Sequence, residues 1–170
     1  LGLRCRPRDI PTTQAAAAVG QCELMYIYDK LFGDYHHTVA QLLITGDDVK
    51  NEQRHRNFSN TLHRLLELGA LPILNENDTV ATEEIVIGDN DTLAAIVAES
   101  VEADLLILLS DIDGLYTADP HRDPEAKLLS HVPALTEEIF ALAGVSASLQ
   151  GTGGMVTKLQ AAKICLSAGC

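Results

Sequence analysis

The sequence has few aromatic and few basic residues. Trp is absent and aromatic residues make up 4% of the 170 residues, whereas 46% are hydrophobic. A core of this kind is built from aliphatic side chains, which suit packed helices and parallel strands better than a sandwich with large aromatic plugs. Lys and Arg number 12 against 24 Asp and Glu, so the formal net charge is −12. Because nucleic-acid phosphates and anionic lipids are bound by clustered basic residues, we expect neither a nucleic acid nor a membrane as partner.

Cysteine motifs and long hydrophobic runs are also missing. The four cysteines form no CxxC pair, so the sequence predicts neither a zinc knuckle nor a disulfide framework, and the six histidines lack the spacing of metal ligands. No apolar run reaches the length of a membrane span, and the first residues do not resemble the apolar part of a signal peptide. We therefore expect a cytoplasmic protein with reduced thiols and, from its length, one layered domain.

Expected helices and strands alternate along the chain. Helical patterns cover residues 11–33, 51–68, 92–103 and 136–143 and the last segment from Met155. Short apolar runs at 38–45, 71–74 and 105–109, with a weaker candidate at 83–87, are typical of strands. The run 105–109 contains only Leu and Ile, which is the pattern of a parallel strand buried on both faces. This order predicts an α/β fold with a mostly parallel sheet and right-handed crossovers.

Polar clusters adjoin three of the expected strands. They are residues 75–79 after the run 71–74, residues 88–91 after 83–87, and Ser110-Asp111 after 105–109. Ligands of open α/β sheets bind beyond the carboxyl ends of the strands, where such clusters meet. One residue of 89–91 would suffice as a helix cap, and Asn75, Asn77 and Asp78 could simply form turns. Their carboxylate and amide oxygens are also suitable acceptors for a substrate ammonium group.

A glycine-rich segment precedes the last expected helix. Residues 151–158 read GTGGMVTK. The glycines let backbone N–H groups approach oxygen atoms, the helix that follows offers its positive end, and Lys158 adds a mobile cation. These are the features of a nucleotide-phosphate cradle, although the spacing excludes the GxxxxGK[ST] loop. From this segment alone, a plain flexible loop before a helix is an equally good interpretation.

Taken together, these segments closely resemble the amino-acid kinase family and, within it, the glutamate 5-kinase branch. The resemblance rests on NENDTVAT at 75–82, GDND at 88–91, LLSDIDGLYTADP at 108–120 and GTGGMVTK at 151–158. The last two segments are shared widely in the family, whereas the first two point to glutamate as substrate. The resemblance implies a three-layer α/β/α sandwich with a mostly parallel central sheet, the carbamate kinase-like fold, of which residues 1–170 form an incomplete amino-acid kinase domain.

The resemblance also implies a reaction and its residues. The reaction would be ATP-dependent phosphorylation of the γ-carboxylate of L-glutamate, the first step of proline biosynthesis, with Mg²⁺ accompanying ATP and no metal ligand from the protein. Lys158 would stabilise the transferring phosphoryl group, Asp91 would position the catalytic lysines, and Asp78 and Asn90 would bind glutamate with Asn75 beside them. The implied ATP-binding residues are Ser110, Asp111, Thr152, Gly153, Gly154, Met155, Val156, Thr157 and Lys158.

Further expectations concern the rest of the protein. Members of the family begin with a strand and a glycine loop that carries a second catalytic lysine, followed by a serine-glycine loop, and Leu1 would fall just after that second loop. Cys170 would fall before the last strands of the kinase fold. We therefore expect residues 1–170 alone to be inactive or nearly so. The resemblance also implies a homo-oligomer and functional coupling to a glutamyl phosphate reductase.

Other functions stay open at this point. A related amino-acid kinase would act on acetylglutamate, aspartate or a nucleotide such as a nucleoside monophosphate. A non-catalytic nucleotide-binding or assembly module would fold without turnover. A doubly wound redox domain is disfavoured because no GxGxxG follows the first strand candidate.

Overall fold

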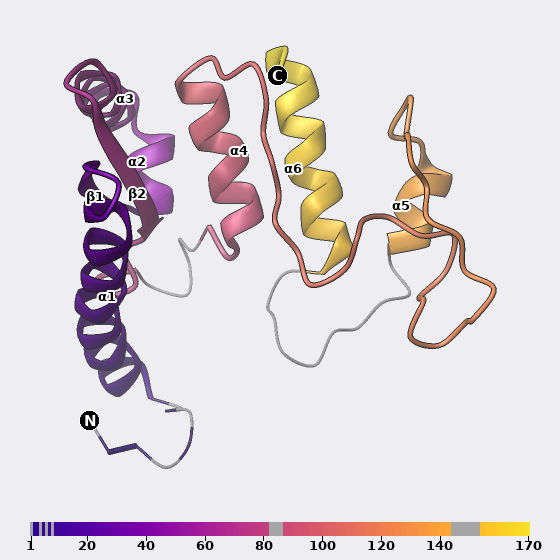
Figure 1. The fold of residues 1–170 in the computed structure, drawn as a ribbon, viewed down its shortest axis with the longest axis horizontal. Helices are drawn as coiled ribbons and strands as arrows, with labels where there is room; N and C mark the ends of the chain where they lie inside the picture. Colours follow the sequence, from indigo (N-terminus) through magenta and orange to yellow (C-terminus); the bar gives the residue numbers. More distant parts are fainter. Residues whose placement is uncertain (1, 4, 6, 8, 82–86, 144–153) are drawn as a thin grey trace. The chain divides into compact units, whose positions relative to one another are not determined.

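The structure is a computed structural model of the chain and describes all residues except 1, 4, 6, 8, 82–86 and 144–153. The chain divides into two compact units, residues 1–87 and residues 88–170. Within the described residues, the first unit contains a two-stranded parallel sheet and three helices, and the second unit contains three helices (Figure 1). No helix among the described residues of either unit is long and apolar enough to cross a bilayer.

The sheet of the first unit joins two strands that are separated by helices in the sequence. β1 (Thr38–Ile44) pairs in parallel with β2 (Ala70–Glu76), with Thr38 opposite Ala70 and Ile44 opposite Glu76. Both expected strands are confirmed, and β2 extends beyond 71–74 to include Asn75 and Glu76. The expected α/β class with a parallel sheet is thus present in the first unit. Of the candidate strand 83–87, residues 83–86 lie outside the described residues, and Ile87 is not in a strand.

Helix α1 (Ile10–Gly33) begins at the signals that predict it. The Asp9 side chain accepts a hydrogen bond from the backbone N–H of Thr12 at 2.9 Å, and Pro11 lies in the first turn. Proline is tolerated there because first-turn N–H groups have no helical acceptor. The helix ends at Gly33, as expected. Its side chains nevertheless remain at least partly exposed, since no residue of α1 is buried.

Two helices cross from β1 to β2, as parallel strands require. They are the short α2 (Gly46–Lys50) and the longer α3 (Glu52–Glu67). The side chain of Asn51 caps α3 by accepting from the N–H of Arg54 at 3.0 Å. Phe58 and Leu62, one turn apart, are buried. The helix expected at 51–68 is therefore confirmed, while α2 was not predicted.

Replacing Leu62 by Ala is expected to lower the free energy of unfolding by about 3 kcal/mol, because the change leaves a cavity in a packed interior. The Leu62 side chain is 2% exposed, whereas Leu66, one turn further along α3, is 48% exposed. Urea unfolding of the full-length polypeptide would measure the loss, with Leu66→Ala as the matched control. Equal losses in the two variants would contradict the burial described for α3.

The second unit is organised by two helices that pack through small side chains. α4 (Asn90–Ser100) and α6 (Met155–Ala168) share a core of Ala95, Ala98, Ala161 and Cys165. Small residues let the two backbones approach each other closely. The remaining helix, α5 (Glu137–Ala143), packs against α6. All three helices were expected, although α4 begins two residues before Thr92 and ends three residues before Ala103.

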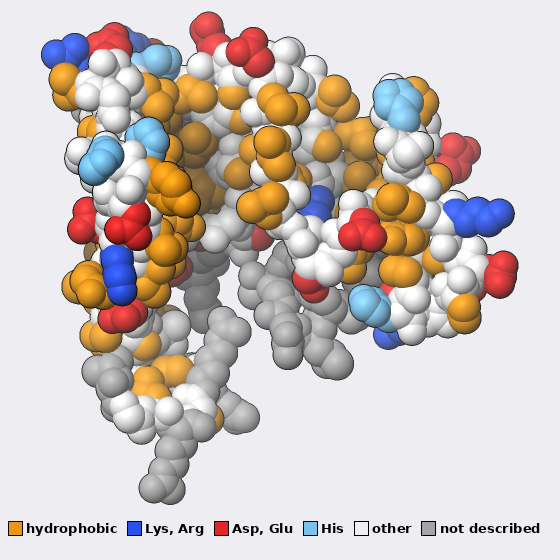
Figure 2. Space-filling model, in the orientation of Figure 1, with side chains coloured by type: hydrophobic (Ala, Val, Ile, Leu, Met, Phe, Trp, Pro, Cys, Tyr) orange, Lys and Arg blue, Asp and Glu red, His pale blue; other side chains and the backbone are white. Residues whose placement is uncertain are grey.

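The segment 105–109 differs from the expectation. It is extended but has no strand partner among the described residues. Leu106 and Leu108 pack against the α4–α6 core, whereas Leu105, Ile107 and Leu109 are 71%, 69% and 91% exposed. Figure 2 shows hydrophobic side chains on the outer surface along this part of the chain. Within the described residues of the second unit, the prediction of a strand buried on both faces is wrong. The period-two alternation places only one face on the helices, and no described strand of this unit covers the other.

Candidate functional site

An ion pair links the first turns of α4 and α6 in the second unit. The Nζ of Lys158 lies 2.9 Å from Oδ2 and 3.2 Å from Oδ1 of Asp91. The hydroxyl of Thr157 donates to the same Oδ2 at 2.7 Å. The side chains of Lys158 and Asp91 are only 20% and 15% exposed, so water screens their attraction less than at an open surface. The pair therefore holds an ammonium group in one place at the start of α6.

The three residues of the acidic cluster 89–91 lie in different surroundings. Asp89 is the cap of α4, since its carboxylate accepts from the N–H of Thr92 at 2.7 Å and from the Thr92 hydroxyl at 2.9 Å. Asn90 is exposed at the first position of α4. Asp91 points to α6 and binds Lys158. The expectation that one of these residues serves as the cap is confirmed.

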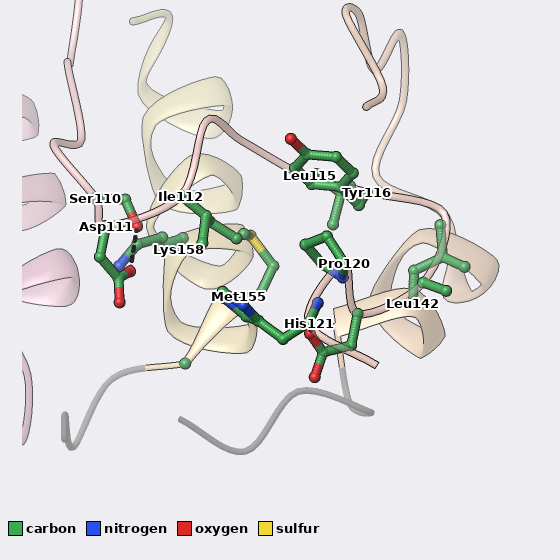
Figure 3. Close-up of a pocket in the computed structure, with 13 residues that line it drawn as sticks. Ser110, Asp111, Ile112, Leu115, Tyr116, Pro120, His121, Leu142, Met155 and Lys158 are labelled. Carbon is green, nitrogen blue, oxygen red and sulfur yellow. Dashed lines mark hydrogen bonds between the residues drawn. The ribbon is translucent and has the colours of Figure 1, made fainter. Parts of the chain in front are cut away.

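A pocket with a cavity of about 110 Å³ lies beside Lys158 (Figure 3). Its polar side contains Ser110, Asp111 and Lys158, which lie together in Figure 3, with the Ser110 hydroxyl donating to Asp111 at 3.3 Å. Its apolar wall is formed by Ile112, Leu115, Ala118, Pro120, Leu142 and Met155. Lys158 is the only Lys or Arg among the described residues that line this pocket. The pocket thus combines an apolar wall with one cation at its edge.

The turn 112–121 forms part of the pocket wall and is fixed by backbone contacts. The N–H of Thr117 donates to the carbonyl of Lys127 at 2.9 Å, and the N–H of Leu129 donates to the carbonyl of Leu115 at 2.8 Å. Desolvation and the neighbouring Asp113 carboxylate raise the pKa of Tyr116 above its usual value. The phenol therefore stays protonated and donates to Asp113 at 3.3 Å. This wall was not assigned from its residues, which alone are more typical of a turn.

The N-terminus of α6 opens onto the same pocket. Gly154 is its cap residue and has no side chain that could satisfy the N–H groups of the first turn. Gly154 and Met155 line the pocket, whereas Val156 is half-buried and is not among the lining residues. Thr152 and Gly153 lie outside the described residues. The described start of α6 therefore presents the positive end of a helix dipole near Lys158.

Two of the expected substrate residues belong to the first unit. Asn75 lies near the end of β2, where its amide donates to Oε1 of Gln21 in α1 at 3.0 Å and accepts from the N–H of Glu76 at 3.0 Å. Asp78 is exposed in the turn that follows β2. The buried Nε2 of Gln21 has no hydrogen-bond partner within the described residues. Gln21 orients Asn75 and was not identified from the sequence, because nothing in the Ala-rich helix distinguishes it.

The described residues contain no group of three or more His, Cys, Asp and Glu side chains that could hold a metal ion.

Comparison with known proteins places these features in a family. The sequence matches the profile of the amino acid kinase family over residues 4–170. It is 60% identical over 157 residues to a protein named glutamate 5-kinase from Rhodospirillum rubrum, which covers 92% of this chain and 42% of that protein. Proteins of the same name from Paramagnetospirillum magneticum and Carboxydothermus hydrogenoformans are 56% and 54% identical, over 96% and 99% of this chain and 44% and 45% of theirs. The chain therefore spans less than half the length of these relatives.

Proposed function

Because this chain belongs to the amino-acid kinase family, we propose that it is part of an enzyme that transfers the γ-phosphoryl group of ATP to the γ-carboxylate of L-glutamate. The observation that carries the proposal is the Asp91–Lys158 pair at the edge of an apolar pocket, at the N-terminus of a helix. The substrate follows from relatives that are named glutamate 5-kinase. We further propose that residues 1–170 form part of the kinase domain and have little activity alone.

The pocket of the second unit suits a nucleotide. Its apolar wall, which includes Leu115, Pro120 and Met155, is suited to the faces of a purine base. The first turn of α6 and Lys158 would receive the phosphates, since a helix N-terminus and an ammonium group both favour anions. Ser110 and Asp111 would bind polar groups of the nucleotide at the rim. Thr152 and Gly153 are proposed as further phosphate-binding residues from their motif alone.

The reaction needs little proton chemistry. An oxygen of the glutamate γ-carboxylate attacks the γ-phosphorus of ATP, the bond to the bridging oxygen breaks, and the electron pair of that bond leaves with ADP. The attacking carboxylate is already ionised near neutral pH, so no general base is required. The ammonium group of Lys158 neutralises charge on the transferring group, which is the main task of a protein in phosphoryl transfer. Mg²⁺ would neutralise further phosphate charge when bound, held mainly by phosphate oxygens and water.

The amino-acid substrate is assigned to Asp78, Asn90 and Asn75. Carboxylate and amide oxygens accept hydrogen bonds from an ammonium group, and an amide N–H can donate to a carboxylate. The contact with Gln21 supports a fixed orientation of Asn75. The product would be γ-glutamyl phosphate, an acyl phosphate that hydrolyses readily, which favours coupling to a glutamyl phosphate reductase in proline biosynthesis. We also propose that the protein is cytoplasmic and forms a homo-oligomer.

Replacing Asp78 by Ala in the full-length polypeptide is expected to raise KM for glutamate more than about tenfold, because a charge-assisted contact with the substrate is lost. A hydroxamate assay that depends on glutamate and ATP would measure this change. The affinity for ATP should stay within about twofold, because Asp78 is not assigned to the nucleotide. The matched control is Asp47→Ala, an exposed aspartate in α2 of the same unit.

Several results would overturn the proposal. Preference of the wild-type protein for acetylglutamate, aspartate or a nucleoside monophosphate would identify a different member of the family. Thermal stabilisation by ATP without transfer to any acceptor would favour a non-catalytic nucleotide-binding module. An unchanged KM for glutamate in Asp78→Ala would remove Asp78 from the substrate site.

A further inference from the structure

We propose that Thr157 is a positioning residue, whose hydroxyl holds the Asp91 carboxylate in the orientation that fixes Lys158, and that this hydroxyl does not bind a phosphate of the nucleotide. The inference rests on the proposed function, because it assigns Thr157 a role in phosphoryl transfer through Lys158. It replaces the role implied for Thr157 by the glycine-loop motif. The contacts of the three side chains carry it.

The hydroxyl of Thr157 has one hydrogen and two acceptors within reach. Its Oγ1 lies 2.7 Å from Oδ2 of Asp91 and 2.8 Å from the carbonyl oxygen of Gly154. The Gly154 carbonyl also accepts from the backbone N–H of Thr157 at 3.1 Å. The carboxylate is the stronger acceptor because it is charged. The hydrogen is therefore directed at Asp91, and the hydroxyl has none left to donate to a phosphate.

The hydrogen bond from Thr157 restricts the rotation of the Asp91 carboxylate more than Lys158 alone can. Oδ2 of Asp91 accepts hydrogen bonds from both Thr157 and Lys158. Oδ1 accepts one only from Lys158, at the longer distance of 3.2 Å. Lysine is a compact charge on a flexible stem of four carbons and can follow a rotating carboxylate. Threonine is short and branched at Cβ, so its side chain is stiff. With Thr157 as a fixed donor, the carboxylate keeps one orientation and the ammonium group is held with it.

The first test compares two replacements of Thr157 in the full-length polypeptide. Thr157→Val keeps the shape and removes the hydroxyl, so kcat is expected to fall about tenfold, the size of one hydrogen bond to a charged group. The KM for ATP should stay within about twofold, because no phosphate contact is lost. Thr157→Ser restores the donor and should return kcat to within about threefold of wild type.

The matched control is Thr61→Val in α3. The Thr61 hydroxyl also bonds within its helix, donating to the carbonyl of Asn57 at 2.9 Å, but no described carboxylate accepts from it. Its kcat should remain that of the wild type. If Thr157 were merely structural, both valine variants would lose stability alike and neither would lose kcat. A rise in the KM for ATP at unchanged kcat in Thr157→Val would show that the hydroxyl binds phosphate, and would overturn the inference.

A second test removes the Asp91 carboxylate, which accepts the hydrogen bond from Thr157. In an Asp91→Ala background, Thr157→Val should have no further effect on kcat, because the hydroxyl then has no carboxylate to orient. A further tenfold loss in that background would contradict the inference, since Thr157 would be acting independently of Asp91.

A third readout does not need glutamate turnover. The reactivity of Lys158 toward an amine-specific reagent, measured by peptide mass spectrometry relative to the exposed Lys163 on the same helix, should rise in Thr157→Val. Absence of phosphoryl transfer to glutamate by the wild type would refute the proposed function, yet a rise in Lys158 labelling would still support the positioning contact. Unchanged labelling of Lys158 would refute the positioning contact even in an active enzyme.

Discussion

Replacing Lys158 by Met in the full-length polypeptide is expected to lower kcat about a thousandfold, while the affinity for ATP falls by less than about tenfold. Met keeps most of the aliphatic stem but removes the ammonium group. Among the described residues that line the pocket, no other Lys or Arg could replace this charge. In the transition state, charge is spread over the three equatorial oxygens of the transferring group. A contact that is stronger there than in the ground state raises kcat, so its loss appears mainly in kcat. Steady-state kinetics with ATP and glutamate would measure it.

The control for this variant is Lys163→Met, which changes an exposed lysine of the same helix. Its kcat should stay within about twofold of wild type, because a solitary surface charge contributes little. Lys158→Met also leaves the Asp91 carboxylate half-buried without its cation, which lowers stability. Nucleotide binding and urea unfolding must therefore show that the variant is folded at the assay temperature. A loss confined to the KM for ATP would mean that Lys158 contributes binding only.

The helices could be predicted because their signals are local. Asp9 and Pro11 define the start of α1, and Asp89 caps α4 just before its apolar stripe. Helix α2 was missed, although Thr45 and Asp48 have the spacing of a capping pair. The Asp48 carboxylate accepts from both the N–H and the hydroxyl of Thr45 at 2.7 Å. A short helix between a strand and a longer helix leaves no periodic pattern, so its cap was the only available signal.

The segment 105–109 could be predicted as extended but not as exposed. Its five residues are all apolar, and composition alone cannot show whether one face or both faces are covered. Burial depends on neighbouring strands, which are long-range partners. Within the described residues of the second unit, the α4–α6 core covers one face of the segment, and the exposed fractions of Leu105, Ile107 and Leu109 belong to the other face.

The site could be predicted in composition but not in its contacts. The clusters 75–79, 88–91 and 151–158 were recognised as chemically unusual because of their polar and glycine content. The contact of Asp91 with Thr157 spans 66 positions and follows from the packing of α4 on α6, which small side chains permit. Most of the apolar wall of the pocket could not be found either. Met155 was implied only by the resemblance, and Leu142 is indistinguishable in sequence from a core residue. The sequence therefore predicts the residue types of the site but not their contacts.

Replacing Asp91 by Asn tests whether the charge of the carboxylate or only its hydrogen bonding holds Lys158 in position. The kcat is expected to fall about a hundredfold. The amide keeps one oxygen, which cannot serve as a charged acceptor for both Thr157 and Lys158. Its NH₂ group is a donor and repels the ammonium group if it faces Lys158. The ammonium group of Lys158 is therefore no longer held at its position, although Asn keeps the shape of the Asp91 side chain. Steady-state kinetics of the full-length polypeptide would measure the loss.

The matched control for this variant is Asp89→Asn, the same substitution two residues earlier. Asn caps helices about as well as Asp, so α4 should keep its start and kcat should stay within about twofold of wild type. Combining Asp91→Asn with Lys158→Met should give a kcat no lower than that of Lys158→Met alone, because Asp91 acts only through the lysine. If the two losses multiplied instead, Asp91 would have to act on the nucleotide or the substrate directly. The carboxylate would then be catalytic in its own right rather than the holder of the ammonium group.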